Sequence, residues 1–304
     1  MKILFDTNIF LDVQRGKITQ QQVATARQKM ASLSAYGCVS PLSLVELGSH
    51  ICDEEKDKYE SYRRAFEAIT QLCDLALLDP EMFMRREIFA HPIGEYGLSP
   101  EDTLKISQVI AQTRDYDRLA DGQVTMWGNI LSRVFIKTGY LKQFREKYEM
   151  QYVQDMEEHV LAILTPDHKE IREGGGLPNV SDQNLRTKFA WFLESDDFED
   201  VFYRFTAIRV NVCLLGTTLN SEWDRQAKEK LADYCAAYKW ILRKIAEAGY
   251  NPEKNKNDFN DIHFLVYLAD PQLTFVTHDG GIVRKIEKAP HKERIQSFTE
   301  WIAK

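Results

Sequence analysis

Five carboxylates in the sequence have residue types and positions that suit a divalent cation: Asp6, Glu46, Asp258, Asp261 and Asp279. No Lys or Arg in these segments is placed to neutralise them, so a bound cation would relieve their mutual repulsion. Mg²⁺ or Mn²⁺ fits better than zinc, because hard cations take oxygen ligands and no set of Cys and His residues accompanies the acids. Such a metal can activate water and stabilise the charge on a transferred phosphate.

These acids are expected along one edge of a parallel sheet. Asp6 follows the apolar run at 2–5, which is too short for a helix and predicts a buried strand. Asp279 comes just after a second such run at 273–277, and Glu46 lies in the second turn of a helix that begins at Ser40-Pro41. Strand ends and the helix starts that follow them share one edge of such a sheet, where ligands bind.

Asp258 and Asp261 open an expected helix at 258–269 that leads to the strand at 273–277. Residues three apart on a helix are neighbours, with about 5–6 Å between their Cβ atoms, so this pair can share one cation. Asp258 could instead only stabilise the helix N-terminus. We leave two histidines out of the site, because His263 is expected to pack on its helix and His278 to be a polar turn residue.

The order of expected elements places these segments in an α/β fold with a parallel sheet flanked by helices. Strands are expected at 2–5, 38–39, 75–78, 273–277 and 295–298, with helices at 19–35 and 54–72 between the first three. Between 81 and 254 the pattern is mostly helical, with helices expected at 101–113, 121–137, 140–164, 183–194, 197–218 and 221–248. The simplest architecture is one α/β domain, formed by 1–80 and 255–304 and interrupted by a helical insertion at 81–254.

Composition sets broad limits on the class of protein. No apolar run approaches the roughly 20 residues of a membrane span. Met1 leads directly into an expected core strand, so we expect a cytoplasmic protein with no membrane partner. Five scattered cysteines favour neither a disulfide framework nor a thiolate zinc site. Setting aside the five carboxylates leaves 41 acidic against 39 basic residues, so the net charge of −7 counts only weakly against a nucleic-acid partner.

Four stretches of the chain resemble the PIN-domain nucleases, a family of small α/β metal-dependent ribonucleases. The resemblance covers about 1–80 and 255–304, less than half of the chain. Each stretch alone is a weak signal, but their order and expected secondary structure match the family. The stretches are Phe5-Asp6-Thr7-Asn8, Ser40-Pro41-Leu42-Ser43-Leu44-Val45-Glu46-Leu47, Asn257-Asp258-Phe259-Asn260-Asp261-Ile262-His263 and Phe275-Val276-Thr277-His278-Asp279.

The resemblance implies an endonuclease that hydrolyses phosphodiester bonds with Mg²⁺ or Mn²⁺, in RNA rather than DNA, as a toxin-like, processing or defence enzyme. It makes Asp6, Glu46, Asp261 and Asp279 the catalytic metal ligands. Asp258 would assist directly or through water, and Asn8 and Thr277 would orient ligands or the scissile phosphate. The insertion departs from the compact toxin form and is a candidate surface for a protein partner or antitoxin, and a homo-oligomer is also compatible.

Two alternatives stay open. A protein with this fold but without useful activity would serve as a binding or scaffold protein, with the insertion as its partner surface. A phosphohydrolase of the haloacid-dehalogenase type also starts from a strand-borne Asp. That family needs a second Asp two residues later, where this chain has Asn8, so this alternative ranks lowest.

Overall fold

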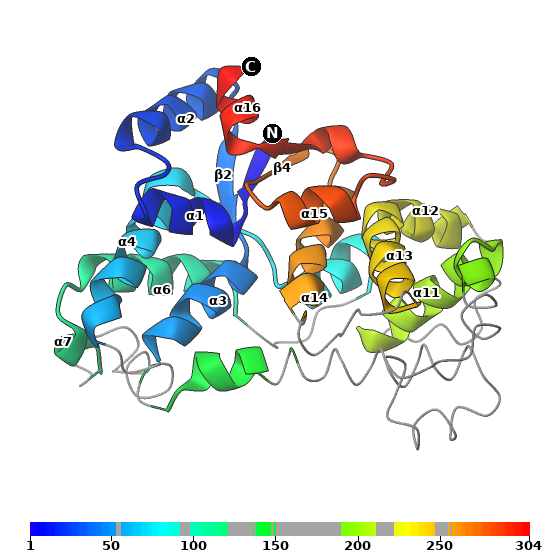
Figure 1. Cartoon of the computed structure of the whole chain (residues 1–304), viewed down its shortest axis with the longest axis horizontal. Coiled ribbons are helices and arrows are strands. Elements are labelled where there is room, and N and C mark those ends of the chain that lie inside the picture. Colours follow the sequence, from blue (N-terminus) through cyan, green and yellow to red (C-terminus); the bar gives the residue numbers. More distant parts are fainter. Residues whose placement is uncertain are drawn as a thin grey trace.

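A five-stranded, all-parallel sheet flanked by helices forms the centre of the molecule, which confirms the predicted α/β class (Figure 1). The structure, a computed structural model, describes residues 1–52, 56–91, 98–120, 136, 138–146, 149, 190–210, 222–246, 255 and 257–304. The strand order is β3-β2-β1-β4-β5. The strands are β1 (Lys2–Phe5), β2 (Tyr36–Val39), β3 (Leu75–Ala76), β4 (Leu273–Thr277) and β5 (Ile295–Ser297).

The central strand β1 joins the two ends of the chain. It pairs with β2 on one side, where Lys2 lies opposite Tyr36, and with β4 on the other, where Lys2 lies opposite Leu273 and Phe5 opposite Val276. Side chains alternate between the two faces of a strand. Ile3 and Phe5 accordingly enter one hydrophobic cluster and Leu4 enters the other, so β1 contributes to the core on both faces of the sheet.

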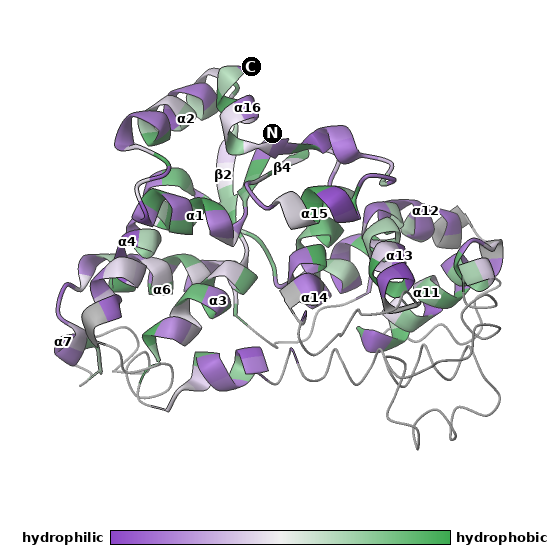
Figure 2. Ribbon diagram, in the orientation of Figure 1, coloured by the Kyte–Doolittle hydropathy of each residue, from purple (hydrophilic) through white to green (hydrophobic). Residues whose placement is uncertain are grey.

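The cluster that contains Ile3 and Phe5 is covered by helices from the first part of the chain and by its last helix. Helix α6, from within the expected insertion, packs on α4 and α3 in this cluster. In Figure 2 the helices carry both apolar and polar residues, as expected for helices with one buried side. The helices of this layer are α1 (Thr7–Gln14), α2 (Gln20–Ser32), α3 (Pro41–Ile51), α4 (Lys56–Leu72), α6 (Pro100–Gln112), α7 (Tyr116–Ala120) and α16 (Phe298–Ala303).

The opposite cluster, which contains Leu4, is covered by helices from the later part of the chain, seen in yellow-green to orange in Figure 1, and by the helical segment at 80–88, seen in cyan. Because helices from 81–254 pack into both clusters beside helices from 1–80 and 255–304, no separate core marks the insertion among the described residues. The division into domains stays a prediction. The elements here are α5 (Pro80–Phe83), the π-helix η1 (Met84–Ile88), α11 (Asp196–Arg209), α12 (Glu222–Lys230), α13 (Ala232–Ala246), α14 (Asn257–His263), the 3₁₀-helices η4 (Phe264–Ala269) and η5 (Lys292–Arg294), and α15 (Gly280–Lys285).

Two helix starts follow the sequence signals closely. The Ser40 hydroxyl accepts a hydrogen bond from the Leu42 amide at 3.2 Å, and Pro41 is the first residue of α3. Ser99 accepts from the Asp102 amide at 3.0 Å, and Pro100 begins α6. In both cases the serine satisfies an amide that has no partner within the helix, which confirms the predicted helix start at Ser40-Pro41.

Two expected helices are each divided. The helix expected at 221–248 is two helices, α12 and α13, with a turn at Leu231, whose amide bonds the carbonyls of both Ala227 and Lys228. Neither glycine nor proline marks this break. The helix expected at 258–269 changes to 3₁₀ winding at Phe264, where five consecutive residues are buried. The expected helices at 121–137, 140–164 and 183–194 lie mostly outside the described residues.

Four cysteines, Cys38, Cys52, Cys73 and Cys235, are buried, as expected for small apolar side chains. Within the described ranges, no helix combines the length and apolar character needed to cross a bilayer.

Candidate functional site

Asp6 stands where β1 ends and α1 begins, at the carboxyl edge of the sheet. Its amide donates to the carbonyl of Val276 at 2.9 Å, which extends the pairing of β1 with β4 beyond the strand. Its carboxylate is 3% exposed and accepts hydrogen bonds from the Thr277 hydroxyl at 2.6 Å and from the Asn8 amide group at 3.3 Å. Asn8 and Thr277, which the resemblance names as orienting residues, thus hold the same oxygen of Asp6.

Asp279 is tied to the same threonine. Its backbone amide donates to the Thr277 hydroxyl at 2.9 Å, and its carboxylate accepts from the Gly281 amide at 2.6 Å, where it caps α15. A side chain at Gly281 would crowd this contact, because a Cβ there would lie 2.8 Å from Asp279 Oδ1. The Thr277 hydroxyl therefore links the positions of Asp6 and Asp279.

Glu46 lies on α3 with Thr7 beside it. A hydrogen bond from Thr7 and the charge of Arg145 favour the ionised form of Glu46, but burial outweighs both and raises its pKa. The Arg145 guanidinium is held in turn by Glu149 at 2.8 Å and by the Ser49 hydroxyl at 3.2 Å. Sequence reasoning missed both Thr7 and Arg145. Arg145 comes from the expected insertion, about a hundred positions from Glu46, so no local pattern connects the two.

Four of the five predicted acids interact electrostatically. The pKa of Asp6 is raised from 3.8 to about 7, mainly by burial, and the charges of Asp261, Glu46 and Asp279 contribute to this rise. The pKa of Asp261 is raised to about 6, again mainly by burial, with contributions from Asp279 and Glu46, while the charge of Lys285 opposes the rise. We call Asp6, Glu46, Asp261 and Asp279 the carboxylate cluster. It brings like charges from four separate segments together at a site that is largely removed from water.

Lys285 corrects the expectation that no cationic residue neutralises these acids. Its ammonium group lies 2.9 Å from Asp258 and 3.0 Å from Asp261, and its side chain is only 2% exposed. Asp258 and Asp261 do share one cation, as their spacing predicted, but that cation is a lysine of the chain itself. A sequence signal existed, because Lys285 lies on the same helical stripe as the buried Ile282 and Ile286.

The two histidines near the cluster have partners outside it. His263 is fully buried, and its Nε2 lies 3.2 Å from the hydroxyl of Tyr234, so it packs against the neighbouring helix α13. His278 Nδ1 lies 3.0 Å from Asp12 on α1. His278 is thus held by a buried carboxylate that sequence reasoning did not single out.

The donor chemistry of the carboxylate cluster suits Mg²⁺ or Mn²⁺, since every side-chain donor is a carboxylate oxygen. No Lys or Arg of the described residues forms an ion pair with Asp6, Glu46 or Asp279. The arrangement is not that of a preformed metal centre, because no three His, Cys, Asp or Glu side chains in the described part of the chain are grouped closely enough to hold an ion. The residue types fit a divalent cation, while the grouping is wider than coordination requires.

Comparison of the chain with protein-family models, with curated proteins and with solved structures gives no match. The evidence for the fold and for the carboxylate cluster therefore comes from this chain alone. The resemblance to PIN-domain nucleases stays a prediction.

Proposed function

We propose that the protein is a divalent-metal-dependent endonuclease of the PIN-like type that hydrolyses phosphodiester bonds, with RNA as its substrate rather than DNA. One observation carries the proposal: at the carboxyl edge of a parallel sheet, burial raises the pKa of Asp6 and of Asp261, and the charges of Glu46 and Asp279 from distant segments add to both rises. A fold that desolvates like charges without a full set of counterions destabilises itself, and such sites cluster where function requires them.

In this proposal Asp6, Glu46, Asp261 and Asp279 hold Mg²⁺ or Mn²⁺, which when bound supplies an activated water and neutralises charge on the attacked phosphate. The chain's own groups prepare the site. Thr277 and Asn8 fix the carboxylate of Asp6 through 2.6 Å and 3.3 Å hydrogen bonds. Residues that orient a ligand in this way typically change metal affinity or activity by about 10–100-fold when they are removed.

Lys285 changes the role proposed for Asp258. The ammonium of Lys285 bridges Asp258 and Asp261, so Asp258 acts through this lysine rather than as a ligand. Among the described residues, Asp6 and Asp279 form no ion pair with a Lys or Arg, and Glu46 is stabilised in its ionised form by a hydrogen bond from Thr7 and the charge of Arg145. We therefore propose a single cation held mainly by these three, with Asp261 shared between that cation and Lys285.

The alternative is a binding or scaffold protein that keeps the fold without activity. The wide spacing of the carboxylates and the lysine among them favour this alternative. Calorimetric titration with Mn²⁺ separates the two, because the nuclease requires saturable binding and the scaffold does not. Three further parts of the proposal depend on the nuclease assignment. They are a cytoplasmic location, a protein partner or antitoxin on the helices between 81 and 254, and a homo-oligomer.

The test is cleavage of labelled single-stranded RNA, single-stranded DNA and tRNA with and without Mn²⁺. We expect Mn²⁺-stimulated cleavage of RNA, reduced by at least about 100-fold in Asp6→Asn and in Asp279→Asn, since each removes a ligand charge. Asp74→Asn is the matched control, because Asp74 precedes β3 at the opposite edge of the sheet and pairs with Arg27. Thermal unfolding monitored by circular dichroism checks that the variants fold. If both site variants cleave as fast as the parent, the assignment is wrong.

A further inference from the structure

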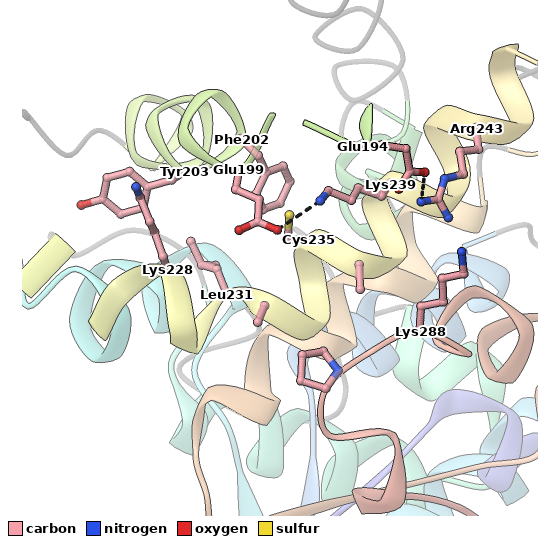
Figure 3. Close-up of a pocket in the computed structure, with 13 residues that line it drawn as sticks. Glu194, Glu199, Phe202, Tyr203, Lys228, Leu231, Cys235, Lys239, Arg243 and Lys288 are labelled. Atoms are coloured by element: carbon pink, nitrogen blue, oxygen red, sulfur yellow. Dashed lines mark hydrogen bonds and ion pairs between the residues drawn. The ribbon is translucent and has the colours of Figure 1, made fainter. Parts of the chain in front are cut away.

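A cavity of about 290 Å³ opens between α11, α12, α13 and the segment at 288–290, and shares no residue with the carboxylate cluster (Figure 3). Its wall is apolar where Phe202, Leu231 and Cys235 line it. Burial raises the pKa of the Cys235 thiol to about 12, so this wall carries no negative charge at neutral pH. We call this cavity, together with the cationic residues Lys228, Lys239, Arg243 and Lys288 that line it, the basic pocket.

The helices fix three of these cations in place. Four residues that line the pocket recur at every fourth position, at Leu231, which precedes α13, and at Cys235, Lys239 and Arg243 within it. Lys239 and Arg243 therefore lie on the same side of the helix as the apolar wall. The ammonium of Lys239 lies 5.2 Å from the centre of the Phe198 ring, and that of Lys228 lies 5.7 Å from the centre of Tyr203. Aromatic faces attract ammonium groups, so these rings hold both lysines at the pocket.

Each of these cations pairs with an acid that is more exposed than the cation itself. Lys239 lies 3.1 Å from Glu199, and their side chains are 18% and 60% exposed. Arg243 pairs with Glu194, and their side chains are 28% and 62% exposed. Lys228 pairs with Asp200, and their side chains are 28% and 45% exposed. Exposed ion pairs contribute only about 0–1 kcal/mol, so the acids can be displaced at little cost while the cations stay at the pocket.

We propose that the basic pocket binds a small organic phosphate of about the size of a nucleoside monophosphate, whose phosphate replaces Glu199 and Glu194 on Lys239 and Arg243. Four cations and two carboxylates line the cavity, and the balance stays positive when Asp200, which pairs with Lys228, is counted, so the pocket favours an anion. A guanidinium binds phosphate oxygens in pairs, and the flanking lysine supplies a further charge. The apolar wall gives the organic part a surface, and the volume lies near the lower end of ligand pockets, about 300–1,000 Å³.

The test is isothermal titration calorimetry of the full chain in EDTA with a nucleoside 5′-monophosphate, the matching nucleoside and inorganic phosphate. We expect the monophosphate to bind, inorganic phosphate to bind more weakly and the nucleoside to give no detectable heat. Arg243→Gln and Lys239→Gln should each weaken binding by at least about tenfold, which equals about 1.4 kcal/mol. Lys244→Gln is the matched control, because it removes the same charge from the same helix but does not line the pocket.

Glu199→Gln separates a ligand site from a purely structural ion pair. If the acid competes with the ligand for Lys239, its removal should tighten monophosphate binding several-fold. If the pair only holds α11 on α13, the variant should melt earlier and gain no affinity. No heat with the monophosphate, equal binding of inorganic phosphate, or unchanged affinity in Arg243→Gln would each overturn the proposal. Because the titration contains EDTA, its outcome is independent of metal-dependent cleavage.

Discussion

Two buried charged sites in the described part of the molecule have opposite kinds of neighbours. Between α4 and α6, Arg63 is 5% exposed, and its guanidinium contacts Glu60 at 2.7 Å, Glu67 at 2.5 Å and the Ala111 carbonyl at 2.7 Å. The hydrogen bond from Arg63 lowers the pKa of Glu60 to about 2. In the carboxylate cluster, by contrast, Asp6 is buried beside like charges and its pKa rises to about 7.

The difference separates charge that stabilises the fold from charge that strains it. The Arg63 site satisfies a buried cation with two carboxylates and a carbonyl, as buried charges require. The carboxylate cluster leaves Asp6 with only hydroxyl and amide donors. Removing the Arg63 charge should therefore destabilise the protein, whereas removing a carboxylate charge from the cluster should stabilise the metal-free protein, and the following variants test this contrast in order of expected size.

Asp6→Asn should stabilise the metal-free protein at alkaline pH. The pKa of Asp6 is raised on folding, so the folded state binds more protons than the unfolded state between pH 3.8 and about 7, and stability falls as pH rises through this window. The variant has no carboxylate at position 6, so its stability does not fall in this way as pH rises. Urea unfolding in EDTA should show it more stable than the parent by up to roughly 4 kcal/mol at about pH 8, with the advantage vanishing near pH 4. An advantage that is the same at both pH values would contradict the assigned pKa.

Lys285→Met should destabilise the metal-free protein by about 3 kcal/mol, because it leaves Asp258 and Asp261 facing each other without their shared cation. Saturating Mn²⁺ should raise the Tm of this variant more than that of the parent, since a divalent cation can take the place of the ammonium. Differential scanning fluorimetry measures both effects. Lys105→Gln, which removes an exposed lysine on α6, is the control, and an equal Mn²⁺ response in all three proteins would argue against a cation site beside Lys285.

Arg63→Met should cost about 2 kcal/mol in urea unfolding, because the Ala111 carbonyl loses its donor and two ion pairs are lost. The cost stays below that of Lys285→Met because Glu60 and Glu67 are about half exposed and return to water. Arg64→Met is the matched control, since Arg64 also pairs with Glu60 but is 60% exposed, and it should change stability by less than about 0.5 kcal/mol. Equal losses in the two variants would remove the contrast on which this comparison rests.

Much of the sheet was predictable from local patterns. The apolar runs at 2–5 and 273–277 and the caps at Ser40 and Ser99 each carry their signal within a few residues. The division of the last long helix at Leu231 carries no such signal, because the double hydrogen bond that makes the turn involves only backbone atoms. The change to 3₁₀ winding at Phe264 depends on packing on all sides, which the sequence expresses only as a continuous apolar run.

The approach of the acids followed from topology, because parallel strands bring Asp6 and Asp279 to one edge whatever lies between them. Their counterions did not follow from it. Lys285 was overlooked although its helical stripe with Ile282 and Ile286 marks an inward position. Arg145 reaches Glu46 only through tertiary packing, so sequence reasoning had no means to find it.

The pairing of β1 with β4 also has a consequence for how the protein is made. β1 is synthesised before the whole segment that separates it from its partner at 273–277, so this partner becomes available only after that segment has been made. Until then one side of an apolar strand has no neighbour, and an unpaired strand edge of this kind invites aggregation of nascent chains. The same delay keeps Asp279 away from Asp6 until the segment between them has been made, so whatever chemistry the two perform together cannot begin before then.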